Sequence, residues 1–239
     1  GRVPKAKPIG AAEHTWILSQ TNITNWRQDL DAFESALYAD TDLSTPQTDP
    51  YGGMQLDMEW IDPNTQMGKF LYDWWPGATR NRHGWVPGKM RILNLWKVDR
   101  HDDRGQLEKV VDEFGAKKLK ITERPLHQEK VQHRPDLDPA IAKKFWDTNT
   151  GFLFHGTRSV NVSGILRKSI LLPKQLVGVS INGAMFGPGK YWADDWKKSA
   201  GYTSLPGSVW SRGDGAVRGR SAFMFAGEVV LGEAFLAPG

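Results

Sequence analysis

The sequence predicts an α+β fold, and three observations support the prediction. Short β-strands are indicated by alternating or continuous apolar residues, over 56–61, 90–98, 152–155 and 223–232. Short helices are indicated between and beside them, over 69–75, 106–114, 138–146, 161–168 and 195–202. Residues that end helices stand where two of these segments stop, Pro76 after the first and Gly115 after the second.

The first 53 residues precede the predicted strands. Residues 1–15 are rich in Pro, Lys, Gly and Ala, which is typical of a linker. Residues 25–38 carry large apolar side chains at helical spacing behind Asn25, a predicted N-cap. Two prolines and a Gly pair over 41–53 predict the loop that follows this helix. Because the chain opens with Gly1 and not with Met, we expect it to be a piece of a longer protein or a processed form.

Residues 115–137 form a basic connection between two predicted helices. They hold six Lys or Arg against three Asp or Glu, together with two histidines and two prolines. We predict a surface insertion here and favour a solvated loop over a docking or nucleic-acid site. Asp138 and Pro139 then begin the next predicted helix.

Composition limits the class of protein. The chain has 239 residues, 39% of them hydrophobic and 24% charged, which is typical of one large soluble domain with or without a small attachment. No apolar run approaches the ~20 residues that cross a bilayer, so we expect no membrane partner. The absence of cysteine fits an intracellular, reducing compartment, and the six histidines show no ligand spacing, so we expect no metal. A net charge of +4 leaves nucleic-acid contact open.

Two motifs carry the chemistry. The first is Leu-Phe-His-Gly-Thr over 153–157. The second runs over 183–202 and joins a glycine-punctuated turn to an aromatic strand end and then to a short polar helix. Glycines let a backbone pass close to a flat ligand, and Tyr191 and Tyr202 could face such a ligand from two sides. Taken singly, each feature is more typical of structural histidines, core aromatics or unrelated glycine loops.

Together the motifs resemble the NAD signature of the poly(ADP-ribose) polymerase family, the diphtheria-toxin-like ADP-ribosyltransferases. In that family His-Gly-Ser/Thr is followed by Met-Phe-Gly-x-Gly-x-Tyr-Phe-Ala-Asp and then by Lys-Ser-Ala-x-Tyr. A later segment, Gly227-Glu228-Val229-Val230-Leu231-Gly232, is similar to the family's Gly-Glu-Val-x-Leu-Gly strand. The resemblance implies two apposed antiparallel sheets with flanking short helices and an NAD cleft. It covers 51–239 as the catalytic domain and leaves 1–50 as a linker and helical remnant of a regulatory region.

The resemblance also implies roles for individual residues. His155 and Tyr191 stand at two of the three catalytic signature positions. Gly156 would hold the nicotinamide carboxamide through its N–H and C=O, helped by the hydroxyl of Ser199, while Tyr202 stacks on the ring. The other residues expected to bind NAD, which is the substrate and the only cofactor implied, are Thr157, Asn161, Ala193 and Lys198, with Tyr191 on the opposing wall and His155 on the adenosine-side ribose.

Several departures from the family pattern matter. Trp192 replaces the usual Phe, Lys190 an aliphatic residue, and Ser169 begins a stretch that often reads Gly-Leu. The family's catalytic glutamate lies on a strand beyond Gly232, so we expect this chain to be truncated before it, and neither Glu228 nor Glu233 to be its equivalent. The helical bundle of nuclear, DNA-activated members is not recognised upstream, so activation by DNA damage is not inferred.

We therefore expect an enzyme that cleaves NAD, transfers ADP-ribose to a protein or nucleic-acid acceptor and releases nicotinamide. The resemblance implies a nuclear location and the DNA-repair setting of the family's nuclear members. Three alternatives stay open: an inactive NAD or ADP-ribose reader, a scaffold subunit with the same fold, and an RNA 2′-phosphotransferase on a related fold. The last would need basic residues gripping an RNA phosphate in place of Tyr191 and Tyr202.

Overall fold

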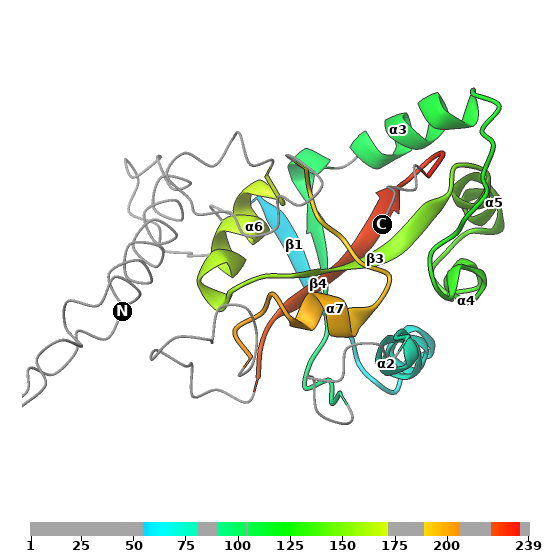
Figure 1. Ribbon diagram of the computed structural model, residues 1–239. Coiled ribbons are helices and arrows are strands. Elements are labelled where there is room, and N and C mark those ends of the chain that lie inside the picture. Colours follow the sequence, from blue (N-terminus) through cyan, green and yellow to red (C-terminus); the bar gives the residue numbers. More distant parts are fainter. Residues whose placement is uncertain (1–54, 81–89, 104, 172–188, 206–220, 235–239) are drawn as a thin grey trace, which may run out of the picture. The chain divides into compact units, whose positions relative to one another are not determined.

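The computed structural model describes residues 55–80, 90–103, 105–171, 189–205 and 221–234 (Figure 1). The helix predicted over 25–38, the loop over 41–53 and the glycine turn over 183–187 lie outside these residues. The described residues belong to two compact units. One contains 55–156, 192–200 and 224–234, within the described ranges. The other contains 157–171, 189–191, 201–205 and 221–223.

A two-stranded antiparallel sheet opens the first unit. It pairs β1 (Leu56–Trp60) with β2 (Trp96–Arg100). The second strand was predicted over 90–98, and its pairing begins later, at Trp96. The reason is the length of β1: beyond the pair Trp60–Trp96 only the N–H of Ile61 reaches the carbonyl of Leu95 before the chain turns at Asp62 into the next helix.

That helix is α2 (Gln66–Gly77), which starts at the N-cap Thr65, whose side chain accepts a hydrogen bond from the N–H of Gly68. It contains Pro76, the residue predicted to stop it, and ends one residue later. Proline has no N–H to donate to the preceding turn and its ring crowds the carbonyl four residues back, so the helix ends within one residue of Pro76.

The second sheet carries the central part of the first unit. It pairs β3 (Thr150–Gly156) with β4 (Met224–Val230) in antiparallel register, with Phe152 opposite Glu228 and Phe154 opposite Ala226; the two strands lie side by side in Figure 1. Both strands were predicted within two residues of these bounds. With short helices around two small antiparallel pairs, the α+β class is confirmed.

Aromatic side chains join α2 to this sheet. The ring of Trp74 stacks on Phe154 with 5.2 Å between centroids, and its centroid lies equally far from that of Phe152. Trp75 also meets Phe154 at 5.2 Å. Phe154 is fully buried, and fully burying such a side chain contributes about 1.5–3 kcal/mol to folding. The core of the unit is therefore centred on the middle of β3.

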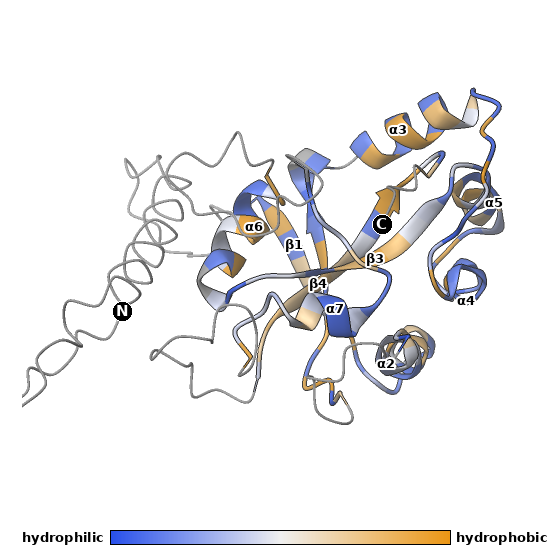
Figure 2. Cartoon of the chain, viewed as in Figure 1, coloured by the Kyte–Doolittle hydropathy of each residue, from blue (hydrophilic) through white to orange (hydrophobic). Residues whose placement is uncertain are grey.

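The remaining helices of the first unit are short. They are the 3₁₀ helix η2 (His101–Asp103), α3 (Gln106–Gly115), α4 (Gln128–Gln132), α5 (Pro139–Asp147) and α7 (Trp196–Ala200). In α3 apolar and polar residues are interspersed along the helix (Figure 2). Asp138 caps α5 as predicted, accepting the N–H of Ala140 at 2.7 Å. The helix predicted over 195–202 is shorter, because the chain turns at Gly201.

The prediction of a solvated loop over 115–137 is confirmed only in part: most of the segment is irregular and about half of its residues are exposed, yet its later part is packed. This segment contains α4, and Gln128, Val131 and Arg134 are all buried. The side chain of Gln128 donates to the carbonyl of Thr150, and Arg124 donates to the carbonyl of Trp146 at 2.8 Å. Charge composition concealed this packing because two of the three buried residues, Gln128 and Arg134, are polar and have specific hydrogen-bond partners.

In the second unit the described elements are the 3₁₀ helix η3 (Ser159–Asn161) and α6 (Val162–Lys168). The helix predicted over 161–168 is confirmed within one residue. Across the described parts of the chain, no helix combines the length and apolar character needed to span a membrane.

Candidate functional site

The carboxyl end of β3 is joined to the segment before α7. The N–H of Phe154 donates to the carbonyl of Ala193 at 2.7 Å, and the N–H of Ala193 donates back to the carbonyl of Phe154 at 2.9 Å. Because both backbone groups of one strand residue point to the same side, Ala193 occupies the edge of β3 opposite β4. This bridge joins Phe154 of the first motif to Ala193 of the second.

Ser199 lies against the same edge. Its side chain is buried, and its hydroxyl donates a hydrogen bond of 3.0 Å to the carbonyl of Phe154, which also accepts the N–H of Ala193. At Gly156, a β-carbon would lie only 1.7 Å from the carbonyl oxygen of Ser199. Any other residue at this position would force the end of β3 away from α7, so glycine is required by close backbone approach.

The register of β3 decides which edge of the strand the backbone N–H and C=O of Gly156 face. In an antiparallel ladder the backbone N–H and C=O of residues two apart point to the same side. Those of Phe154 point to Ala193, so those of Gly156 point to the same edge, away from β4. This edge therefore presents a backbone donor, a backbone acceptor and the Ser199 hydroxyl within a few residues of one another.

Two further predicted residues belong to this first unit. His155 is half-buried at the end of β3, and its ring lies 5.6 Å from that of Trp192, at an interplanar angle of 57°. Trp192, where the family usually has Phe, thus contacts the histidine of the first motif. Lys198 is exposed on α7.

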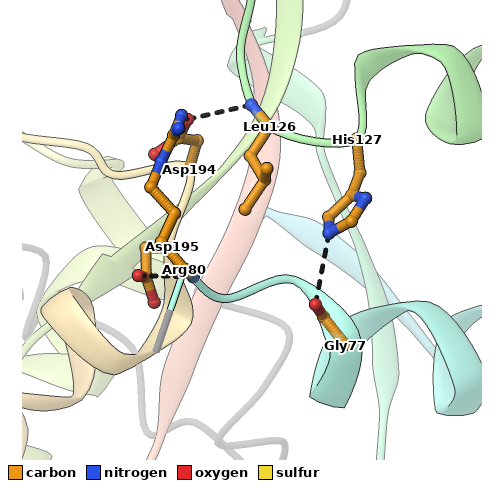
Figure 3. A network of polar contacts seen from close by, with 6 residues as sticks. All are labelled: Gly77, Arg80, Leu126, His127, Asp194 and Asp195. Carbon is orange, nitrogen blue, oxygen red and sulfur yellow. Dashed lines mark hydrogen bonds and ion pairs between the residues drawn. The ribbon is translucent and has the colours of Figure 1, made fainter. Parts of the chain in front are cut away.

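Two carboxylates anchor the segment between Ala193 and α7 (Figure 3). Asp194 accepts hydrogen bonds from the guanidinium of Arg80 at 2.6 Å and from the N–H of Leu126 at 2.8 Å. Asp195, which is buried, accepts the N–H of Arg80 at 2.9 Å and that of Lys197 at 2.9 Å. The hydrogen bond to Asp194 and the charge of that carboxylate raise the pKa of the Arg80 guanidinium, which stays charged.

Beside these carboxylates, His127 contributes a ring nitrogen that lies 3.2 Å from the carbonyl of Gly77 (Figure 3). The segment over 115–137, predicted as an insertion, therefore contacts both the end of α2 and Asp194, which lies just before α7. Sequence reasoning did not assign a role to Arg80, Leu126 or Asp195. For Asp195 a signal was available, because an aspartate just before a short helix is typical of an N-cap.

The other predicted residues lie in the second unit. Thr157 is buried, and its hydroxyl oxygen accepts a hydrogen bond of 3.0 Å from the side chain of Asn161, so these two residues form one local pair. Close by in the chain, the N–H of Ser159 donates to the hydroxyl of Ser204 at 2.9 Å. Tyr191 and Tyr202 are both half-buried.

Comparison with known proteins decides the family. A family model described as the poly(ADP-ribose) polymerase catalytic domain matches residues 77–237, well over half of the chain. The chain belongs to this family. The resemblance inferred from the two motifs is thereby confirmed, and the substrate of the family's catalytic domain is NAD. No curated protein matches the chain significantly.

Within this polymerase-family domain two glutamates near the end of the described chain have structural partners. Glu228 forms an ion pair with the buried guanidinium of Arg134, which also binds Asp136 at 2.9 Å. Glu233 accepts the N–H of Lys120 at 2.7 Å. Both carboxylates hold the segment over 115–137 against β4 and the residues after it.

The donor set also bears on metal chemistry. Among the described residues of this family member, no group of three or more His, Asp or Glu side chains could hold a metal ion.

Proposed function

We propose that the protein is an ADP-ribosyltransferase that cleaves NAD and transfers ADP-ribose to a protein or nucleic-acid acceptor, releasing nicotinamide. The observation that carries the proposal is the edge of β3, where the backbone of Gly156 and the hydroxyl of Ser199 face the same side. The carboxamide of nicotinamide has one acceptor oxygen and an NH₂ donor group, and this edge offers matching groups.

The reaction breaks the glycosidic bond between nicotinamide and ribose. Nicotinamide leaves with the bonding electron pair, the acceptor nucleophile bonds to the ribose carbon, and the acceptor loses its proton. Because positive charge develops on the ribose in the transition state, holding nicotinamide and ribose in fixed orientation lowers the barrier.

Residue roles follow from the family pattern. Gly156 and Ser199 bind the carboxamide, Tyr202 stacks on the nicotinamide ring, and Tyr191 supplies the opposing wall beside Ala193. His155 binds a ribose hydroxyl on the adenosine side, and the Thr157–Asn161 pair binds the adenosine half. Lys198 lies on the acceptor side. The hydrogen bond within the Thr157–Asn161 pair supports treating these two residues as one element.

Binding of nicotinamide requires a rearrangement at Ser199. In the structure the Ser199 hydroxyl donates its hydrogen to the carbonyl of Phe154. To donate to the carboxamide oxygen instead, the hydroxyl rotates and exchanges one acceptor for another. The cost is that of one neutral hydrogen bond, about 1 kcal/mol, which the new bond offsets.

The second candidate is a domain that binds NAD or ADP-ribose without transfer. It is favoured by the engagement of Glu228 and Glu233 in structural contacts, which leaves neither carboxylate directed to the edge of β3 among the described contacts.

The two candidates are separated by incubating the 239-residue chain with NAD labelled in the adenosine half. Nicotinamide release and label on protein or added RNA are followed together, with benzamide binding measured by calorimetry in parallel. Release with equal transfer of label supports the transferase. Saturable benzamide binding without release supports the binding domain. Absence of both would overturn the assignment of nicotinamide to Gly156 and Ser199.

A further inference from the structure

The first turn of α7 is held by one buried residue, Asp195. Asp195 accepts the N–H of Lys197 through its side chain, and its carbonyl accepts the N–H groups of Lys198 and Ser199 at 3.1 and 3.4 Å. A helix of five residues is too short to be stable alone. The position of α7, and with it Ser199, therefore depends on how Asp195 is held.

Asp195 is held by the residues that follow α2. Its second carboxylate oxygen accepts the N–H of Arg80. One residue further, the N–H of Trp196 donates to the carbonyl of Ala78 at 3.1 Å, and the indole N–H donates to the carbonyl of Pro76 at 3.0 Å. These contacts tie the first residues of α7 to the segment 76–80 along its backbone.

The same helix α2 also fixes β3. Trp74 and Trp75 pack on the ring of Phe154. The backbone of Phe154 in turn exchanges two hydrogen bonds with that of Ala193. The two sides of the proposed nicotinamide-binding edge, Gly156 on β3 and Ser199 on α7, are thus both positioned from α2. Their backbones approach so closely that a small shift of α7 changes the groups offered to a ligand.

We propose that Asp195 is a positioning residue, which sets Ser199 against Gly156 by joining the first turn of α7 to the residues that follow α2. The inference rests on the proposed function of that edge and goes beyond it. Asp195 lies next to the motif aspartate Asp194, yet the two differ in their role. Asp194 binds one exposed guanidinium and one backbone N–H, whereas Asp195 is buried and binds two backbone N–H groups from separate segments.

The substitution Asp195→Asn tests the proposal because it preserves shape. Asparagine has one carbonyl oxygen, so one of the two backbone N–H groups then faces the NH₂ group of the side chain. The matched control is Asp138→Asn, at an aspartate that caps α5 by accepting the N–H of Ala140 and has no described contact with α7. Each variant loses a helix-capping carboxylate.

Benzamide affinity of the 239-residue chain is measured by calorimetry, at a temperature where both variants are folded. Hydrogen exchange of peptides over 152–157 and 196–200 is measured without ligand. We expect Asp195→Asn to weaken benzamide binding about three- to tenfold and to speed exchange in both peptides. In Asp138→Asn, affinity should stay within about twofold of wild type and the two peptides should exchange as before.

Equal benzamide affinity of Asp195→Asn and the wild-type chain would overturn the proposal, and so would unchanged exchange in both peptides. Loss of affinity to the same degree in Asp138→Asn would show a general loss of stability and also overturn it. If the wild-type chain does not bind benzamide, the proposed function fails. The exchange comparison then still decides whether Asp195 positions α7 against β3.

Discussion

The carbonyl oxygen of Ser199 lies 1.7 Å from the point where a β-carbon on residue 156 would stand. The first motif of the sequence therefore needs its glycine for a reason internal to the protein. By the register of β3, the N–H and C=O of Gly156 face the same edge as the hydroxyl of Ser199. The packing of β3 against α7 and the proposed recognition of nicotinamide therefore both depend on glycine at position 156.

Gly156→Ala should abolish benzamide binding and destabilise the chain by about 1–3 kcal/mol, since the added methyl group overpacks against backbone that cannot move away cheaply. Urea unfolding and calorimetry measure the two effects. Gly77→Ala is the control, because a β-carbon there meets nothing within 4 Å and α2 is helical at that point. It should leave affinity unchanged and stability equal or slightly higher. Benzamide binding by Gly156→Ala at wild-type affinity would contradict the site.

Ser199→Ala removes the hydrogen bond to the carbonyl of Phe154. We expect a loss of about 1 kcal/mol in the free energy of unfolding and a fivefold or greater loss of benzamide affinity, roughly the value of one hydrogen bond. Thermal unfolding and calorimetry are the measurements. Ser204→Ala also loses a side-chain hydrogen bond, to the N–H of Ser159, and should affect stability alone. If Ser199→Ala and Ser204→Ala bind benzamide with equal affinity, Ser199 has no part in recognising the carboxamide.

Tyr202→Ala should weaken benzamide binding by about 1–3 kcal/mol through loss of stacking. Tyr202→Phe keeps the aromatic face and should bind within about 1 kcal/mol of the wild-type chain. Competition against a fluorescent nicotinamide analogue would measure both variants on one scale. An alanine variant with unchanged affinity would remove Tyr202 from the site.

The ion pair between Arg134 and Glu228 should couple the segment over 115–137 to β4. Arg134 is buried, and its guanidinium also lies over the ring of Phe152 at 5.0 Å. A double-mutant cycle with Arg134→Met and Glu228→Gln should give a coupling energy of about 1–3 kcal/mol. The exposed pair Lys143–Asp147 is the control, with an expected coupling of about 0.5 kcal/mol or less. Equal coupling energies in the two cycles would show that burial adds nothing.

Local patterns predicted most of the elements that carry the proposed site. The strand ending at Gly156 and the aspartate that caps α5 follow from apolar runs and capping chemistry, which are local. The motif residues on β3 and α7 were predicted from the family resemblance, and the bridge between Phe154 and Ala193 gives their proximity a physical basis.

What local patterns missed depends on contacts between distant parts of the chain. The packing of Gln128 and Arg134 is invisible in a segment that reads as charged and loop-like, because their partners Thr150 and Glu228 lie 22 and 94 residues away in sequence. The same holds for Arg80, whose N–H reaches Asp195 across 115 residues. Strand β2 was misplaced because pairing depends on the length of its partner, β1.

The most direct test of the central claim is the amide resonance of Gly156 during a titration of the isotopically labelled chain with benzamide. We expect a saturable downfield shift of the Gly156 N–H, because this group then donates to the carboxamide oxygen, with a parallel change at Ser199. Saturable benzamide binding that leaves both resonances in place would show that the ligand binds elsewhere and not at the edge of β3.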